Sequence, residues 1–308
     1  MSSVAAPAFS LRDRLTGAWG RRLVIGVPML FLLAFFLAPF LVVLKISVSE
    51  MENVVFKDLI TWSEGMLQLK LKLGNYLFVA QDDLYFKTYL SSLKYAGITT
   101  AICLVLAYPF AYFMARSPAD KRPALLMLVM LPFWTSFLLR VYAWKMLLAD
   151  NGVFNNFALW AGLASEPVKM MNTPFSLVLG MVYTYLPFMI LPLYANLVKM
   201  DLRLLEAALD LGATPWGAFW RITVPLSKSG IIAGSMLVFI PCVGEFVIPE
   251  LLGGPQTLMI GRVLWDEFFS NNDWPMAATV AVVMVLLIIV PLAWFNKYQA
   301  ESTAGARA

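Results

Sequence analysis

The chain has 308 residues, of which 60% are hydrophobic and only 14% are charged, with a formal net charge of +4. A soluble domain of this length cannot bury so much apolar side chain, so the composition indicates that lipid forms part of the solvent. The chain has no histidine and only two cysteines, Cys103 and Cys242. It thus lacks the commonest metal ligand and general base, which argues against a metal centre and against an enzyme.

Six hydrophobic runs are each long enough to cross a hydrocarbon core about 30 Å thick, which takes roughly 20 helical residues. They are expected near Leu23–Leu44, Ser92–Met114, Ala124–Leu148, Phe175–Val198, Ile231–Leu252 and Met276–Asn296. A backbone in lipid must satisfy its own hydrogen bonds, so these runs predict helices and an all-α membrane protein with six transmembrane helices. The first run is longer than the core of a signal peptide and no cleavage site follows it, so we expect an uncleaved span.

Charge is distributed unevenly between the two sides of these spans. Residues 1–22, 115–123, 199–229 and 297–308 together carry 13 basic and 6 acidic residues, whereas the other segments carry 10 basic and 13 acidic residues. Loops rich in lysine and arginine stay in the cytoplasm. The pattern therefore predicts that both termini are cytoplasmic. The basic residues form no stripe with interleaved aromatics, so they do not indicate nucleic-acid binding.

The segments on the opposite side contain short elements. Between Ile46 and Ser91, leucines at every second position from Leu67 to Leu73 have the period of a strand and predict a small β element outside the membrane. Asp82 is placed to cap a helix that runs into the second span. Two further segments, Val153–Trp160 and Ile260–Phe269, predict short helices on the membrane face.

The loop before the fifth predicted span has the most informative pattern. Small and acidic residues are followed by a glycine, an isoleucine and a proline: Glu206, Ala207, Ala208, Gly212, Ile222 and Pro225. The pattern predicts a short helix, a left-handed turn at Gly212 and a second helix that starts at Thr214 and Pro215. Such a pair of helices is suited to a groove on another protein. An ordinary amphipathic helix packed on its own bundle is the alternative.

This pattern resembles the EAA loop of the binding-protein-dependent ABC importer permeases. The resemblance implies the type I ABC importer permease fold and a coupling helix, formed by Glu206, Ala207, Ala208 and Gly212, that docks on an ATP-binding subunit. The chain has no G-x-x-x-x-G-K-[ST] phosphate loop. We therefore expect ATP and Mg to bind a separate ATPase and this chain to bind no cofactor.

The stretch from Phe239 to Pro255, with the segment after Met259 and the region from Trp134 to Trp144, is similar to the putrescine and spermidine importer permeases. A polyamine cargo is expected from this resemblance. Glu245 lies within a predicted span, where a carboxylate costs about 2.5 to 3.5 kcal/mol and needs a partner, and a diammonium substrate would be one. Further candidates for an acidic and aromatic pathway are Glu250, Asp266, Glu267, Trp134, Tyr183 and Tyr185.

Alternatives remain for each of these residues. Glu245 and Arg140 fall at similar depths in their predicted spans, so a structural ion pair between them is an equal possibility. The three aromatic residues are also consistent with ordinary packing, and Glu250, Asp266 and Glu267 with a solvated surface. The same machine with another cargo, such as an amino acid or an anion, and an ion-coupled carrier that acts alone are the competing functions.

The resemblance also implies an organisation and a set of partners. The expected parts are a cytoplasmic segment 1–22, a first helix and periplasmic segment 23–91, a five-helix core 92–296 that contains the coupling loop 199–229, and a cytoplasmic tail 297–308. The expected partners in the bacterial inner membrane are a second homologous permease, preferably different from this chain, two ATP-binding subunits and a periplasmic polyamine-binding protein.

Overall fold

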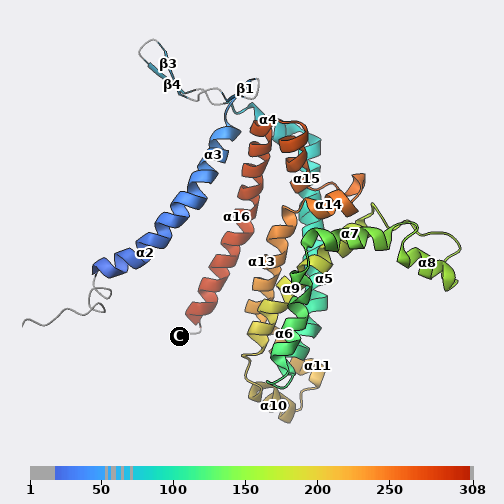
Figure 1. Ribbon diagram of the computed structural model, residues 1–308. Helices are drawn as coiled ribbons and strands as arrows, with labels where there is room; N and C mark the ends of the chain where they lie inside the picture. The colour runs from blue at the N-terminus through green and yellow to red at the C-terminus, as the bar shows by residue number, and fades with distance from the viewer. Residues whose placement is uncertain (1–17, 53–54, 57–59, 64–65, 70–71, 306–308) are drawn as a thin grey trace, which may run out of the picture. The chain divides into compact units, whose positions relative to one another are not determined.

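The computed structural model describes residues 18–52, 55–56, 60–63, 66–69 and 72–305. It divides into two compact units, one formed by Met1–Asn75 with Trp274–Val282 and the other by Tyr76–Asp273 with Val283–Ala308. Most of the described residues are helical (Figure 1). Each unit has its own set of internal contacts.

The first unit contains a long apolar helix. It consists of α2 (Ala18–Leu32), a π-helical turn η1 (Leu33–Leu37) and α3 (Ala38–Ser47), and it includes the predicted first span. Its end contacts α16 (Trp274–Gly305), because the hydroxyl of Thr279 donates to the carbonyl oxygen of Ser47 at 3.1 Å. Side chains along the candidate span are exposed, as expected for a surface that faces lipid or another membrane protein.

Two short antiparallel hairpins follow this helix. In the first, β1 (Met51–Glu52) pairs with β2 (Val55–Phe56), and in the second, β3 (Ile60–Ser63) pairs with β4 (Met66–Leu69). The strand β4 includes the first half of the alternating leucine pattern, and Leu71 lies outside the described residues. The backbone then returns to the helix end, where the Lys72 amide donates to the Val48 carbonyl at 3.0 Å.

Three helices form the core of the second unit: α5 (Asp83–Arg116), α9 (Pro174–Leu197) and α13 (Lys228–Val243). After α4 (Gly74–Gln81), Asp82 caps α5 as predicted, since its carboxylate accepts from the Leu84 amide at 2.6 Å. Small residues face the neighbouring helices and allow close packing. The buried core includes Cys103, Ala107 and Ala111 of α5, Met181, Met189 and Leu193 of α9, and Val238 and Cys242 of α13.

The third predicted span, Ala124–Leu148, is wrong as a single straight helix. Here α6 (Arg122–Met130) and a 3-10 turn η2 (Leu131–Trp134) are separated from α7 (Phe137–Leu148), and the two halves are bent by 82°. The physical reason is local: Pro132 interrupts the helical hydrogen bonds, and Thr135 and Ser136, after the 3-10 turn, adopt extended backbone angles. Hydropathy alone cannot detect this change of direction.

The fifth predicted span, Ile231–Leu252, is also interrupted. The helix α13 ends at Val243, and a separate short helix α14 (Val247–Leu252) begins after the break at residues 244–246. A 3-10 turn η4 (Pro255–Thr257) follows α14. The two segments predicted to be surface helices are helical: α8 (Val153–Trp160), and α15 (Ile260–Trp265) with a π-helical turn η5 (Asp266–Ser270). After the break, α14 packs against α7 and α9, and α15 packs against α5 and α14 (Figure 1).

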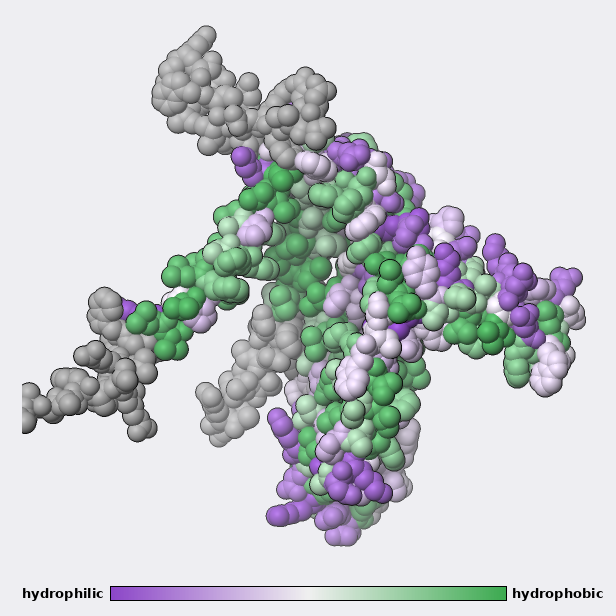
Figure 2. Space-filling view, viewed as in Figure 1, coloured by the Kyte–Doolittle hydropathy of each residue, from purple (hydrophilic) through white to green (hydrophobic). Residues whose placement is uncertain are grey.

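Hydropathy along the helices is consistent with a membrane protein. Among the described residues, Arg22–Ser47, Asp83–Arg116 and Pro174–Leu197 are long and apolar enough to cross a membrane, and each bent pair counted as one span raises the number to five. Trp274–Ile289 is a shorter apolar helix. Figure 2 shows apolar residues along the helices of the second unit and a hydrophilic surface at the end formed by α10 (Arg203–Asp210).

Candidate functional site

Two short helices follow α9 and form the structure predicted around Gly212. The helix α10 ends just before Gly212, which has a φ of +85°, and α11 (Pro215–Ala218) begins after it. The hydroxyl of Thr214 caps α11 by accepting from the Gly217 amide at 3.1 Å. Glycine adopts this left-handed conformation without steric cost. The prediction of two helices joined at Gly212 is confirmed, and we refer to residues 203–218 as the coupling knob.

The coupling knob exposes apolar side chains beside a carboxylate. The side chain of Leu211 is 88% exposed and that of Trp216 is 69% exposed, while Glu206 and Ala207 are also on the surface. Unlike the spanning helices, this end of the second unit also carries many hydrophilic side chains (Figure 2). Apolar side chains surrounded by polar ones are typical of a protein docking surface, which agrees with one of the two interpretations of the loop.

Aromatic contacts join the knob to α5. The ring of Phe219, in the π-helical turn η3 (Phe219–Thr223), stacks on Trp216 at 5.6 Å and meets Tyr108 and Tyr112 edge-on at 5.4 and 6.1 Å. After α12 (Val224–Leu226), Tyr108 also forms a 2.8 Å hydrogen bond with the hydroxyl of Ser227. The knob and α5 are therefore joined by packed rings and by one hydrogen bond at Ser227.

Glu245 lies at the break between α13 and α14. One carboxylate oxygen accepts from the amides of Phe246, Val247 and Ile248, at 3.2, 3.0 and 3.4 Å. The other accepts from the hydroxyl of Tyr185 at 2.5 Å. The side chain thus satisfies the first amides of α14 and ties this helix to α9, an arrangement that favours the negative charge at a helix N-terminus.

The predicted alternative, an ion pair between Glu245 and Arg140, is wrong. Both residues are described, and no ion pair joins them within 4.0 Å. The guanidinium of Arg140 instead lies over the rings of Phe133 and Phe137, at 5.3 and 6.0 Å. The reason is the 82° bend before α7, because equal depth along two straight helices no longer implies proximity.

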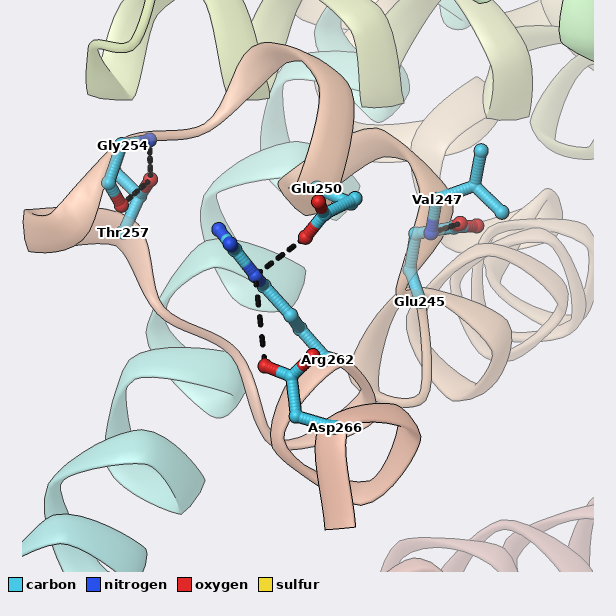
Figure 3. Close-up of polar contacts among 7 residues, drawn as sticks. All are labelled: Glu245, Val247, Glu250, Gly254, Thr257, Arg262 and Asp266. Carbon is cyan, nitrogen blue, oxygen red and sulfur yellow. Dashed lines mark hydrogen bonds and ion pairs between the residues drawn. The ribbon is translucent and has the colours of Figure 1, made fainter. Parts of the chain in front are cut away.

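A charged cluster lies between α14 and α15. The Nε atom of Arg262 is 2.6 Å from a carboxylate oxygen of Glu250 and 3.9 Å from one of Asp266 (Figure 3). Glu250 and Asp266 are about half exposed, but their charges already have a cationic partner. An amine that binds these carboxylates must compete with Arg262. Sequence reasoning assigned no role to Arg262, although its spacing of four residues from Asp266 on one helix was a usable signal.

The remaining predicted pathway residues do not come together. Glu267 accepts from the hydroxyl of Tyr85 at 2.8 Å and from the side-chain Nδ2 of Asn271 at 2.9 Å. Tyr183 meets the ring of Trp144, at 5.4 Å. Within the described part of the chain, no ring contact joins the largely exposed Trp134 to Tyr183 or Tyr185. The structure therefore supports separate polar sites and no aromatic cage.

Gly261 allows α15 to approach the break. A Cβ atom at this position would lie 2.5 Å from the carbonyl oxygen of Gly244 and 2.6 Å from that of Glu245. These are backbone atoms, so they cannot move aside as the end of a flexible side chain can. Gly261 is a second residue that sequence reasoning missed, because the contact joins segments whose directions depend on the break.

Replacement of Gly261 by alanine is expected to destabilise the second unit by about 1 to 3 kcal/mol, the usual cost of forcing extra volume into a packed site. The matched control is Gly97→Ala on α5, where a Cβ has nothing within 4 Å and helix propensity improves. Thermal unfolding of the purified variants in detergent measures the difference. Equal midpoints for both variants would show that the close approach is not a constraint.

The chain matches a known family over nearly its whole length. The model of the binding-protein-dependent transport system inner membrane component covers residues 3–303. The spermidine/putrescine transport system permease protein PotB of Escherichia coli is 44% identical over 230 residues, which are 73% of this chain and 83% of PotB. Its counterpart in Haemophilus influenzae is 38% identical over 274 residues, 88% of this chain and 92% of that protein.

Solved structures resemble the fold. A chain of a bacterial ABC transporter that imports the polysaccharide alginate has a TM-score of 0.68 at 16% identity, and the match covers 94% of this chain and 98% of that chain. A chain of the methionine transporter MetNI has a TM-score of 0.52 at 14% identity, with 69% and 93% coverage. The helical fold is thus that of ABC importer permeases. The protein belongs to the family of binding-protein-dependent transport system inner membrane components.

Proposed function

We propose that the protein is the membrane permease subunit of an ATP-driven importer that moves putrescine, spermidine or both from the periplasm to the cytoplasm by alternating access. The observation that carries this proposal is the coupling knob, whose exposed surface and ring contacts to α5 suit the transfer of force from another protein. The polyamine cargo rests on the names of the relatives that are 44% and 38% identical. The chain is a transport subunit and not an enzyme.

The proposed topology has six membrane crossings and cytoplasmic termini. Each bent helix pair counts as one crossing, α16 supplies the last, and the two hairpins lie in the periplasm. The uneven distribution of basic residues supports this orientation. In this arrangement residues 1–22 and 297–308 are cytoplasmic, 23–91 form the first helix and periplasmic segment, and 92–296 form the core around the coupling loop 199–229.

The proposed partners follow from the same arrangement. Glu206, Ala207, Ala208 and Gly212 meet one ATP-binding subunit of a pair, and ATP and Mg bind there while this chain binds no cofactor. A second, homologous but different permease completes the pathway, and a periplasmic polyamine-binding protein delivers the cargo. As the ATPase pair closes, a force on the knob reaches α5 through Phe219, and the bundle changes between outward-open and inward-open states.

The substrate pathway is proposed to pass the break between α13 and α14. Among the described residues Glu245 forms no ion pair within 4.0 Å, so its field attracts an ammonium group even though its oxygens accept hydrogen bonds. Glu250 and Asp266 contribute after Arg262 is displaced. Tyr185 positions Glu245, while Trp134, Tyr183 and Glu267 are peripheral to this route.

Uptake of labelled putrescine and spermidine is the test, in cells that lack this gene and any redundant polyamine importer. Restoration of uptake by the wild-type gene is the expected result. If uptake of both polyamines is the same with and without the gene, the cargo is another solute, such as an amino acid or an anion. If the purified chain alone moves solute in vesicles without an ATPase, an ion-coupled carrier replaces the importer.

A further inference from the structure

A groove of about 510 Å³ runs along the second unit between α5 and α9. On the α5 side its residues recur every four positions, and on the α9 side they come from the first nine residues of the helix. The lining side chains include Lys94, Ile98, Ile102 and Leu106 of α5 and Phe175, Val178 and Val182 of α9. Among the residues that line the groove, Lys94 alone is charged, and most of the others are apolar.

Lys94 places a positive charge at one end of the groove. Lys94 and Pro174, the first residue of α9, both line it, so the charge is level with the end of the neighbouring spanning helix. Within the described residues, Lys94 forms no ion pair within 4.0 Å, and its ammonium lies 5.5 Å from the centroid of the adjacent Tyr95 ring. A cation at the membrane boundary is stabilised by an anion at that level.

The length of the groove corresponds to one leaflet. Lys94 and Leu106 are 12 residues apart on one helix, which is a rise of about 18 Å at about 1.5 Å per residue. Half of a hydrocarbon core about 30 Å thick is about 15 Å. An acyl chain that starts at the level of Lys94 therefore ends near the middle of the bilayer, at the level of Leu106, the last α5 residue that lines the groove.

We propose that this groove binds an anionic phospholipid, with the phosphate beside Lys94 and one acyl chain along Ile98, Ile102 and Leu106. The charge of Lys94 selects the headgroup, and the apolar walls, where Ile102 is 37% exposed, bind the chain. The partial positive charge at the N-terminus of α9, which begins at the same level, acts in the same direction. The lipid thereby joins α5 to α9, the two helices that carry the knob contacts and Tyr185.

The test uses the assembled transporter, purified in detergent and titrated with phosphatidylglycerol or phosphatidylcholine of the same chain length. Bound lipids are counted by native mass spectrometry. The wild type is expected to retain phosphatidylglycerol about fivefold better, the factor that corresponds to about 1 kcal/mol per lysine near an anionic headgroup. Lys94→Gln is expected to lose this preference. Ile102→Trp, which fills the groove, is expected to retain less of both lipids.

The matched control is Lys87→Gln, since Lys87 lies on the same helix, outside the groove, and pairs with Asp83 at 2.7 Å. It should keep the wild-type preference. Equal preference in Lys94→Gln and wild type would overturn the proposal. Dissociation of the permease pair by Ile102→Trp, with unchanged lipid retention, would also overturn it and would identify a helix of the second permease as the occupant. Lipid retention and dissociation of the permease pair are both measured without a transported substrate, so these results do not depend on whether the cargo is a polyamine.

Discussion

Replacement of Gly212 by proline is expected to lower uptake by at least tenfold while the permease remains at its normal level in the membrane. Proline fixes φ near −65°, whereas Gly212 has a φ of +85°, so the chain between α10 and α11 must change direction. Proline also removes the amide that donates to the Leu209 carbonyl at 2.9 Å. A lost hydrogen bond and a forced backbone change of about 1 to 3 kcal/mol are comparable to the roughly 1.4 kcal/mol that corresponds to a factor of ten. The knob is exposed, so its distortion leaves the buried core intact.

Labelled-substrate uptake, normalised to immunodetected permease in isolated membranes, measures the effect of Gly212→Pro. The matched control is Gly212→Asn, because asparagine tolerates the left-handed conformation and should keep most of the activity. ATP hydrolysis by the reconstituted complex, stimulated by the binding protein, gives a second readout that should fall with uptake. Normal uptake in Gly212→Pro would mean that the knob does not couple the ATPase to transport.

Replacement of Glu245 by leucine is expected to remove most of the permease from the membrane. Leucine leaves the Tyr185 hydroxyl and the first amides of α14 without their acceptor, and each unsatisfied buried group costs about 1 to 3 kcal/mol. Glu245→Gln has nearly the same shape and retains a carbonyl oxygen for those amides. We expect Glu245→Gln to reach the membrane at the wild-type level.

Comparison of the two Glu245 variants separates the structural role of the carboxylate from the role of its charge. The amount of inserted protein reports the hydrogen bonds, and the polyamine concentration for half-maximal uptake reports the field of the carboxylate. We expect this concentration to rise in Glu245→Gln, because the attraction for an ammonium group is lost. Wild-type levels of Glu245→Leu would contradict the structural role. An unchanged half-maximal concentration in Glu245→Gln would remove Glu245 from the substrate pathway and leave it as a structural residue.

The coupling knob and the break at Glu245 lie at opposite ends of α13, and both contact the same core. Phe219 reaches α5 at Tyr108 and Tyr112, while Glu245 reaches α9 at Tyr185. Rings thus join the region of the knob to α5, and a carboxylate joins the start of α14 to α9. Because α5 and α9 pack against each other in the core, the proposed coupling would act through the angle between these two helices.

Local features of this protein were determined by the sequence itself. The cap at Asp82, the left-handed turn at Gly212 and the helix start at Thr214 depend on residues within a few positions of one another. The helical class likewise follows from the length of the apolar runs, because a backbone in lipid must satisfy its own hydrogen bonds. Interactions over such short distances along the chain are the same in most tertiary contexts.

Only the tertiary structure determined which residues contact the charged side chains near the two interrupted spans. Arg140 and Glu245 appeared equally deep in two straight spans, but the helix that carries Arg140 is bent by 82° and its guanidinium lies over Phe133. Arg262 meets Glu250, and Gly261 meets the backbone at Gly244, because α14 and α15 leave the axis of α13. The directions of these short helices depend on packing against α5, α7 and α9. Packing between distant segments leaves no periodic pattern in hydropathy, which is why the arrangement of this site was not predictable.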